Sequence, residues 1–160
     1  MTPQIGRGTT RLTNLSSTLW RLREVLDHLL FKIFETQLIL ESDATHWLAK
    51  AGRELDAALQ ELRHVEVMRA VETVAAADQL HASANITLAE LTRRAPAPWT
   101  SIFEEHRTAL RELTGKVDHA LDSVPRVSET NADVEIELVR RFVTETLGNA
   151  RQASLITFLA

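Results

Sequence analysis

Apolar residues recur in steps of three and four along the stretch Leu19–Leu40. Such spacing places them on one side of an α-helix, because 3.6 residues complete a turn. The row consists of Leu19, Leu22, Leu26, Leu29, Ile33 and Leu40, with Thr36 as a polar member. Leu30, Phe34 and Leu38 widen the row beyond a narrow two-helix contact, so we expect this helix to meet more than one neighbour.

The boundaries of this first helix follow from the residues around it. Residues 1–14 show no periodicity and carry two glycines, which predicts a flexible N-terminus. Ser16 or Ser17 is the expected N-cap, because a short side-chain oxygen there accepts a hydrogen bond from a free backbone N–H group. No glycine or proline follows before Glu41, near which the helix is expected to end.

A second long helix is predicted from about Thr45 to His81. Residues 42–45, between the two helices, favour caps over helix interiors, and they indicate either a tight corner or a kink. Gly52 costs about 1 kcal/mol relative to alanine inside a helix, and we expect it to permit close approach of another backbone. The expected apolar face consists of Leu48, Ala51, Leu55, Leu59, Leu62 and Val65, followed by Val71, Val74, Ala75 and Ala77.

The chain after this helix divides into shorter units. Residues 82–87 form a candidate loop, and residues 88–94 a short helix. Prolines at positions 96 and 98 then break the helical pattern, because proline lacks the N–H group that a helix interior needs. A third long helix is expected over residues 99–122. Its apolar row consists of Phe103, His106, Leu110, Leu113, Val117 and Ala120.

A last helix is predicted over residues 133–147, and Gly148 is a suitable residue to end it. The tail, residues 149–160, is rich in apolar residues. Two interpretations stay open: this helix packs as the fourth helix of a bundle, or its apolar face is an interaction site for a partner. The residues of that face are Val134, Leu138, Phe142 and Leu147.

These patterns together predict one all-α domain over residues 15–148, built as an elongated bundle of long antiparallel helices with coiled-coil-like packing. Only 5 glycines and 4 prolines occur in 160 residues, which leaves little turn chemistry for a sheet. A net charge of −4 argues against general nucleic-acid binding. The lack of cysteine and of any long uninterrupted apolar run is typical of a cytoplasmic protein without a membrane span.

The sequence offers little support for catalysis or for a metal or cofactor. A di-metal bundle needs ligand pairs on facing helices, whereas the pairs found here lie on or near one helix, so we interpret them as surface polar pairs. His106 falls within an apolar row and no third group is suggested to orient it, which favours a packing role over a catalytic base. We therefore do not expect an enzyme. The carboxylate–histidine pairs with i, i+3 spacing are Asp43 with His46, Glu61 with His64, and Asp78 with His81.

Three tryptophans stand near the expected helix starts, at Trp20, Trp47 and Trp99. They suit packing at the edges of the core, where large aromatic side chains are partly buried. The alternative is a role as interface anchors, since tryptophan is enriched at binding hot spots. We favour packing.

Several short stretches resemble the FlgN family of flagellar export chaperones. The resemblance covers about residues 18–122, and Asn131 is similar to the residue that begins the last helix of the family. The stretches are Trp20-Arg21, Arg23-Glu24, Leu29-Leu30-Phe31-Lys32, Glu35-x-Gln37-Leu38, His46-Trp47-Leu48-Ala49, Arg53-Glu54-Leu55 continuing to Glu72, Pro98-Trp99 and Glu104-Glu105-His106-Arg107.

This resemblance implies a cytoplasmic chaperone that binds the C-terminal helices of flagellar hook-associated proteins and delivers them to the export apparatus. The client-binding segment of the family is C-terminal, which together with the apolar face of the last helix assigns client contacts to Val134, Leu138, Phe142 and Leu147. The export gate and a second copy of the chain are further candidate partners. The alternative is a structural, dimerising coiled-coil scaffold without chaperone activity.

Overall fold

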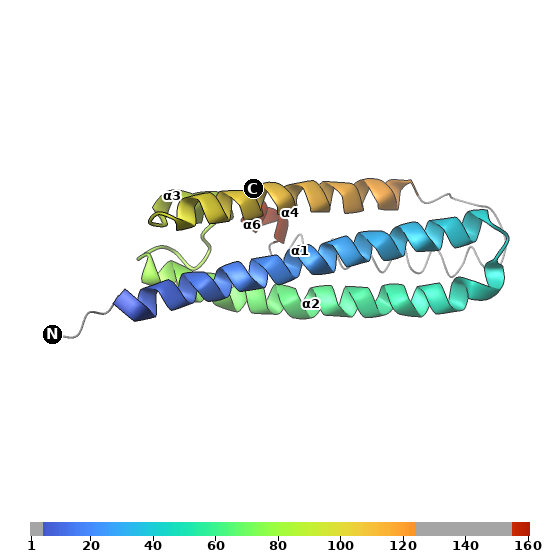
Figure 1. Cartoon of the computed structure of the whole chain (residues 1–160), viewed down its shortest axis with the longest axis horizontal. Coiled ribbons are helices and arrows are strands. Elements are labelled where there is room, and N and C mark those ends of the chain that lie inside the picture. The colour runs from blue at the N-terminus through green and yellow to red at the C-terminus, as the bar shows by residue number, and fades with distance from the viewer. Residues whose placement is uncertain (1–4, 124–154) are drawn as a thin grey trace.

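The computed structural model describes residues 5–123 and 155–160, and the regular structure in these ranges is entirely helical (Figure 1). The all-α prediction is therefore confirmed for this part of the chain. None of the helices described is long and apolar enough to span a membrane. The elements are α1 (Ile5–Glu41), the 3₁₀ helix η1 (Thr45–Trp47), α2 (Leu48–Gln79), α3 (Leu88–Arg94), α4 (Trp99–Asp122) and α6 (Leu155–Leu159).

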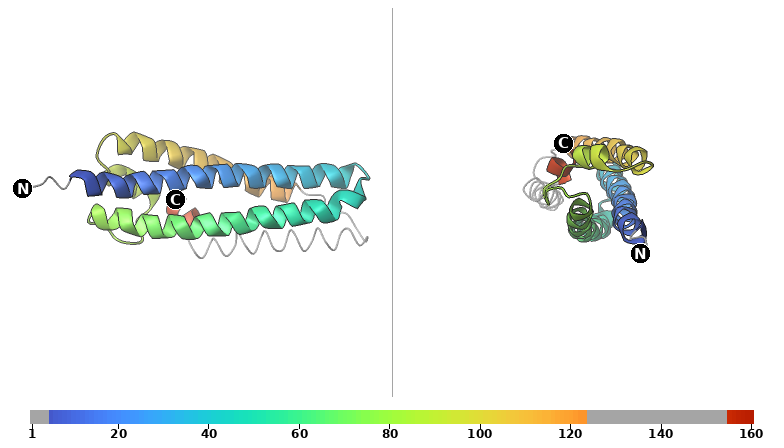
Figure 2. Two further views of the ribbon diagram at one scale, coloured as in Figure 1. Left: turned by 60° about the horizontal axis from the view of Figure 1, so that its bottom comes forward. Right: turned by 90° about the vertical axis from the view of Figure 1, so that its left-hand side faces the viewer.

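Helix α1 is the centre of the bundle, with α2 packed along one side of it and α4 along another (Figures 1 and 2). The prediction of more than one neighbour is thus confirmed. Each leucine in such a row stabilises the fold by roughly 1.5–3 kcal/mol relative to an exposed one, so this helix supplies much of the core. The row is buried at Leu12, Leu15, Leu19, Leu22, Leu26, Leu29 and Ile33.

Ion pairs between α1 and α2 show that the two helices run antiparallel as a hairpin. Arg11 Nη1 lies 2.6 Å from Asp78 Oδ2, near one end of the pair. Lys32 Nζ lies 2.6 Å from Glu54 Oε2, near the other end. Asp43, in the turn between the helices, has a left-handed φ of 56°, which aspartate tolerates better than most residues. The corner expected at residues 42–45 is therefore a tight turn, not a kink.

Helix α4 runs parallel to α1, because each long helix reverses the direction of the one before it. The Ser16 Oγ and His106 Nε2 atoms lie 3.0 Å apart near one end. Farther along, Gln37 Nε2 donates to the Ala120 carbonyl oxygen at 2.8 Å. The short helix α3 and the loops beside it occur where the sequence predicted them, and they carry the chain from the end of α2 to the start of α4.

The expected start of the first helix at Ser16 or Ser17 is wrong, because α1 already begins at Ile5. The apolar row extends backward through Leu12 and Leu15, which are 1% and 0% exposed. Burial of these leucines outweighs the low helix propensity of the glycines at positions 6 and 8. Ser16 is a buried residue inside the helix rather than a cap.

The predicted apolar face of the second half of α2 is also partly wrong. Val71 and Val74 are 63% and 49% exposed, whereas Arg69 and Thr73 are buried. Steps of four residues from Val65 lead to Arg69 and then to Thr73. Because both residues are polar, the apolar pattern of the sequence does not show that this face of α2 is buried. Arg69 tolerates burial because its Nε lies 3.0 Å from Glu66 Oε1, and a buried charge is costly unless it is paired.

The C-terminal helix α6 is short and packs on α3 and α4. Leu155, Phe158 and Leu159 are all buried. The ring of Phe158 also covers the guanidinium of Arg69, whose Cζ lies 4.4 Å from the ring centroid. A cation–π contact of this kind stabilises a desolvated arginine, so the apolar tail joins the core through this helix.

Candidate functional site

A group of exposed apolar side chains lies where α1 and α2 meet at their turn. Three come from α1 and one from η1. We call these four residues the tip cluster: Phe31, Phe34, Leu38 and Trp47, which are 56%, 54%, 49% and 50% exposed. Monomeric proteins rarely leave large apolar side chains grouped in this way unless the surface binds something.

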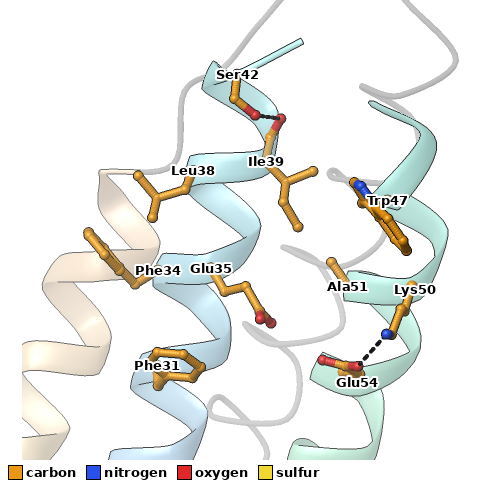
Figure 3. Close-up of a pocket in the computed structure, with 10 residues that line it drawn as sticks. All are labelled: Phe31, Phe34, Glu35, Leu38, Ile39, Ser42, Trp47, Lys50, Ala51 and Glu54. Atoms are coloured by element: carbon orange, nitrogen blue, oxygen red, sulfur yellow. Dashed lines mark hydrogen bonds and ion pairs between the residues drawn. The ribbon is translucent and has the colours of Figure 1, made fainter. Parts of the chain in front are cut away.

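A groove of about 650 Å³ runs between the two arms of the hairpin at this end. Figure 3 shows Phe31, Phe34 and Leu38 projecting from α1 along one side of it. Trp47 and Lys50 stand on the other side, and Glu35, Ile39 and Ala51 lie between the two sides. Ser42 and Glu54 complete the lining. The groove is therefore mainly apolar, with charged groups at a few positions, which is typical of a binding site.

Charged residues in and beside the groove are held by one another. Lys32 Nζ contacts Glu54 Oε2 at 2.6 Å and Glu35 Oε2 at 3.0 Å. The hydrogen bond from Lys32 lowers the pKa of the Glu54 carboxyl, and the same bond, with that to Glu35, raises the pKa of Lys32. Lys32 and Glu54 are thus both ionised at neutral pH, and their ion pair fixes α2 against α1 beside the apolar part of the groove.

Trp47 is positioned by polar neighbours rather than by the core. The Lys50 Nζ atom lies 5.6 Å from the centroid of the Trp47 ring. The His46 ring is tilted against the same indole at a centroid distance of 5.0 Å. These contacts orient the indole while leaving half of it exposed. A rigid aromatic side chain of this kind loses little entropy when a partner covers it.

A second groove, of about 550 Å³, lies on the other flank of α1 against α4. Phe34 and Leu30 contribute its apolar surface from α1, and Gly115 and His119 line it from α4. Phe34 also lines the first groove. The apolar surface at this end of the bundle is therefore continuous across α1, with Phe34 at its centre.

The buried contact between Ser16 and His106 is the arrangement closest to a catalytic pair. Their side-chain atoms lie 3.0 Å apart, but His106 is 1% exposed, and its Nδ1 has no hydrogen-bond partner among the residues described. The Trp20 ring covers the imidazole edge-on at a centroid distance of 5.2 Å. Nucleophilic catalysis needs an orienting group and access for substrate, so this geometry fits the packing role predicted for His106.

Two of the carboxylates from the predicted carboxylate–histidine pairs form ion pairs with arginines of α1. Glu61 binds Arg21 at 2.6 Å, and Asp78 binds Arg11 at the same distance. Within residues 5–123 and 155–160, no group of three or more potential ligands is close enough to hold a metal ion. Among the residues that the structure describes, a Cβ added to Gly52 would meet nothing within 4 Å, so none of their backbones makes the close approach expected at this glycine.

The client-binding residues predicted from the sequence, Val134, Leu138, Phe142 and Leu147, lie outside the described residues. The tip cluster was only partly visible in the sequence. Phe34 and Leu38 had widened the apolar row of the first helix, but Phe31 lies off that row.

Of the tryptophans, Trp99 stacks on Phe103 within the bundle, whereas Trp20 and Trp47 each keep about half of their surface exposed.

No family model matches the chain, and comparisons with curated proteins and with solved structures find no match either.

Proposed function

We propose that the protein is a chaperone that binds an amphipathic helix, and that its client is the C-terminal helix of a flagellar hook-associated protein awaiting export from the cytoplasm. The observation that carries this proposal is the tip cluster around its groove. The identity of the client rests on the sequence resemblance to FlgN-type chaperones. The all-helical bundle is compatible with that resemblance.

The size and shape of the tip surface suit a helix. The four side chains of the tip cluster together expose roughly 400 Å² of mainly apolar surface, taking the usual areas of aromatic and leucine side chains. An amphipathic helix laid in the groove would cover this surface with residues spaced three and four apart. Glu35 and Lys50, beside the groove, would then contact the polar flanks of the client helix.

The expected affinity is moderate. Burying roughly 400 Å² on each partner yields less than a standard interface of about 1,600 Å² in total, and a client helix that is disordered when free must also be ordered on binding. Dissociation constants in about the micromolar range follow from these two effects. Release at the export apparatus then needs no large input of energy, which is what a delivery role requires.

Two surfaces are candidates for the client contact, and they can be separated by experiment. Peptides spanning the C-terminal helices of hook-associated proteins are titrated into the full chain by isothermal calorimetry. One variant carries Phe34→Asp with Leu38→Asp in the tip cluster. A second carries Leu138→Asp with Phe142→Asp. The control carries Ala57→Asp with Thr108→Asp, which places the same charges at exposed positions of α2 and α4 outside the tip cluster.

The proposal expects at least a tenfold loss of affinity for the tip variant and none for the control, with helical circular dichroism unchanged in both. A tip variant that binds like the wild type contradicts the assignment to the tip. Loss of binding in the second variant alone moves the client site to residues 133–147. If the wild-type chain binds no such peptide, the chaperone function is wrong and the scaffold alternative takes its place.

A further inference from the structure

A second exposed apolar surface lies on α2, far from the tip. In Figure 1, α2 packs along α1, and α4 lies on the other side of α1. Four large apolar side chains stand on the outer face of its second half. We call them the α2 patch: Val67, Met68, Val71 and Val74, which are 65%, 44%, 63% and 49% exposed.

The apolar positions of this patch are symmetric about Val71. Val74 and Ala75 stand three and four residues after Val71, and Met68 and Val67 stand three and four residues before it. Helical residues at these intervals share one face. A twofold axis through Val71 would therefore place the patch of one copy against the same patch of another, which is the self-complementarity that a twofold dimer requires.

The charges at the two ends of the patch are also complementary. The basic residues Arg63 and His64 precede the patch, and Asp78 follows it seven residues after Val71. His64 stands seven residues before Val71, so an antiparallel pair of α2 helices brings His64 and Arg63 of each copy to Asp78 of the other. Asp78 already pairs with Arg11, but its side chain keeps 74% of its surface exposed and can accept a further contact.

We propose that the α2 patch mediates self-association, with two copies of α2 packed antiparallel about a twofold axis at Val71. The patch exposes roughly 350 Å² per copy, so a dimer would bury roughly 700 Å² in total, below the range of about 1,200–2,000 Å² for stable complexes. The dimer is therefore weak and forms in a concentration-dependent way. The inference is independent of the proposed function, since the patch and the tip cluster share no residue.

Engineered disulfides test this geometry cleanly, because the chain contains no cysteine. Val71→Cys places two thiols face to face at the axis. Ala57→Cys is the matched control, since Ala57 is exposed on the same side of α2. In the proposed dimer the two copies of residue 57 are separated by about 42 Å along the helices at 1.5 Å per residue, and no disulfide spans that distance.

Under mild oxidation of the full chain, the proposal expects Val71→Cys to form a covalent dimer at least ten times faster than Ala57→Cys. Equal rates for the two variants would overturn the proposed interface. The relative direction of the two α2 helices is tested by mixing chains that carry Met68→Cys with chains that carry Val74→Cys. An antiparallel pair cross-links the mixture faster than either variant alone, whereas faster cross-linking of each variant with itself would refute the antiparallel arrangement.

Discussion

Replacement of His106 should make the stability of the bundle less sensitive to acid. Burial between α1 and α4, with a smaller contribution from the positive charge of Arg23 and partly offset by Glu105, lowers the pKa of His106 from its ordinary 6.5 to about 4. The folded protein therefore binds this proton less readily than the unfolded chain does. The neutral ring stabilises the fold fully above pH 6.5, and this stabilisation is lost as the pH falls toward 4.

The size of the effect follows from the two pKa values. Lowering the pH from 7 to 5 should remove about 2 kcal/mol of unfolding free energy through His106, and the full shift corresponds to about 3 kcal/mol. A His106→Leu, Ser16→Ala double variant removes the titrating group without leaving the Ser16 hydroxyl buried and unpaired. Its free energy of unfolding should accordingly fall by about 2 kcal/mol less than that of the wild type over this interval.

The assay is urea unfolding followed by circular dichroism at pH 7 and pH 5, on both proteins. The other five histidines are exposed and remain in both, as do all carboxylates, so their contributions cancel in the difference between the two proteins. Equal pH dependence in wild type and variant would refute the burial of a neutral His106. A steeper dependence in the variant would do so as well.

Two further tests concern the N-cap of α3 and the docking of α6. Thr87→Ala should lower the free energy of unfolding by about 1 kcal/mol, because the Thr87 hydroxyl accepts a hydrogen bond from the Glu90 N–H group at 3.2 Å at the start of α3. Thr87→Ser should retain most of this stability in the same urea titration. If Thr87→Ala leaves the stability unchanged, the cap is contradicted. Phe158→Ala should cost about 3–5 kcal/mol if α6 is part of the core, whereas Ile156→Ala, at a position 44% exposed, should change stability by less than about 0.5 kcal/mol. Similar thermal denaturation midpoints for the two alanine variants would show that α6 is not docked.

Much of the fold was predictable because the apolar spacing is regular. The row through Leu19, Leu26 and Ile33 correctly identified α1 as the helix that others pack against. The bounds of α3 and α4 agree with the expected residue ranges, since prolines and cap-forming residues mark their ends. These features depend on local sequence alone, so no knowledge of the tertiary arrangement was needed.

The errors arose where tertiary contacts override local pattern. Arg69 occupies a buried position of α2, and only its contacts with Glu66 and Phe158 make that burial tolerable. Because Arg69 is polar, the sequence pattern assigned the apolar face of this part of α2 to Val71 and Val74, which are in fact exposed. Ser16 was expected to be a cap because serine favours that position, but it instead faces His106, 90 residues away in the chain.

The candidate site was harder to predict, because exposure depends on what the neighbouring helices leave uncovered. Phe34 and Leu38 carried a visible signal, since they widened the apolar row of α1. Trp47 was considered as an interface anchor but was assigned to packing, and Phe31 became a candidate only when the hairpin placed it beside the groove. Sequence periodicity distinguishes apolar from polar faces, but it does not show which apolar residues lack a partner.

The most direct test of the tip as a client site uses Trp47 as its own reporter. In the Trp20→Phe, Trp99→Phe variant, Trp47 is the only tryptophan, and it is half exposed. Titration with the client helix should shift its fluorescence to shorter wavelength in a saturable way, because the helix excludes water from the indole. A matched variant that retains Trp20 alone should show no shift. Binding detected by calorimetry without any shift of the Trp47 emission would contradict the proposed site.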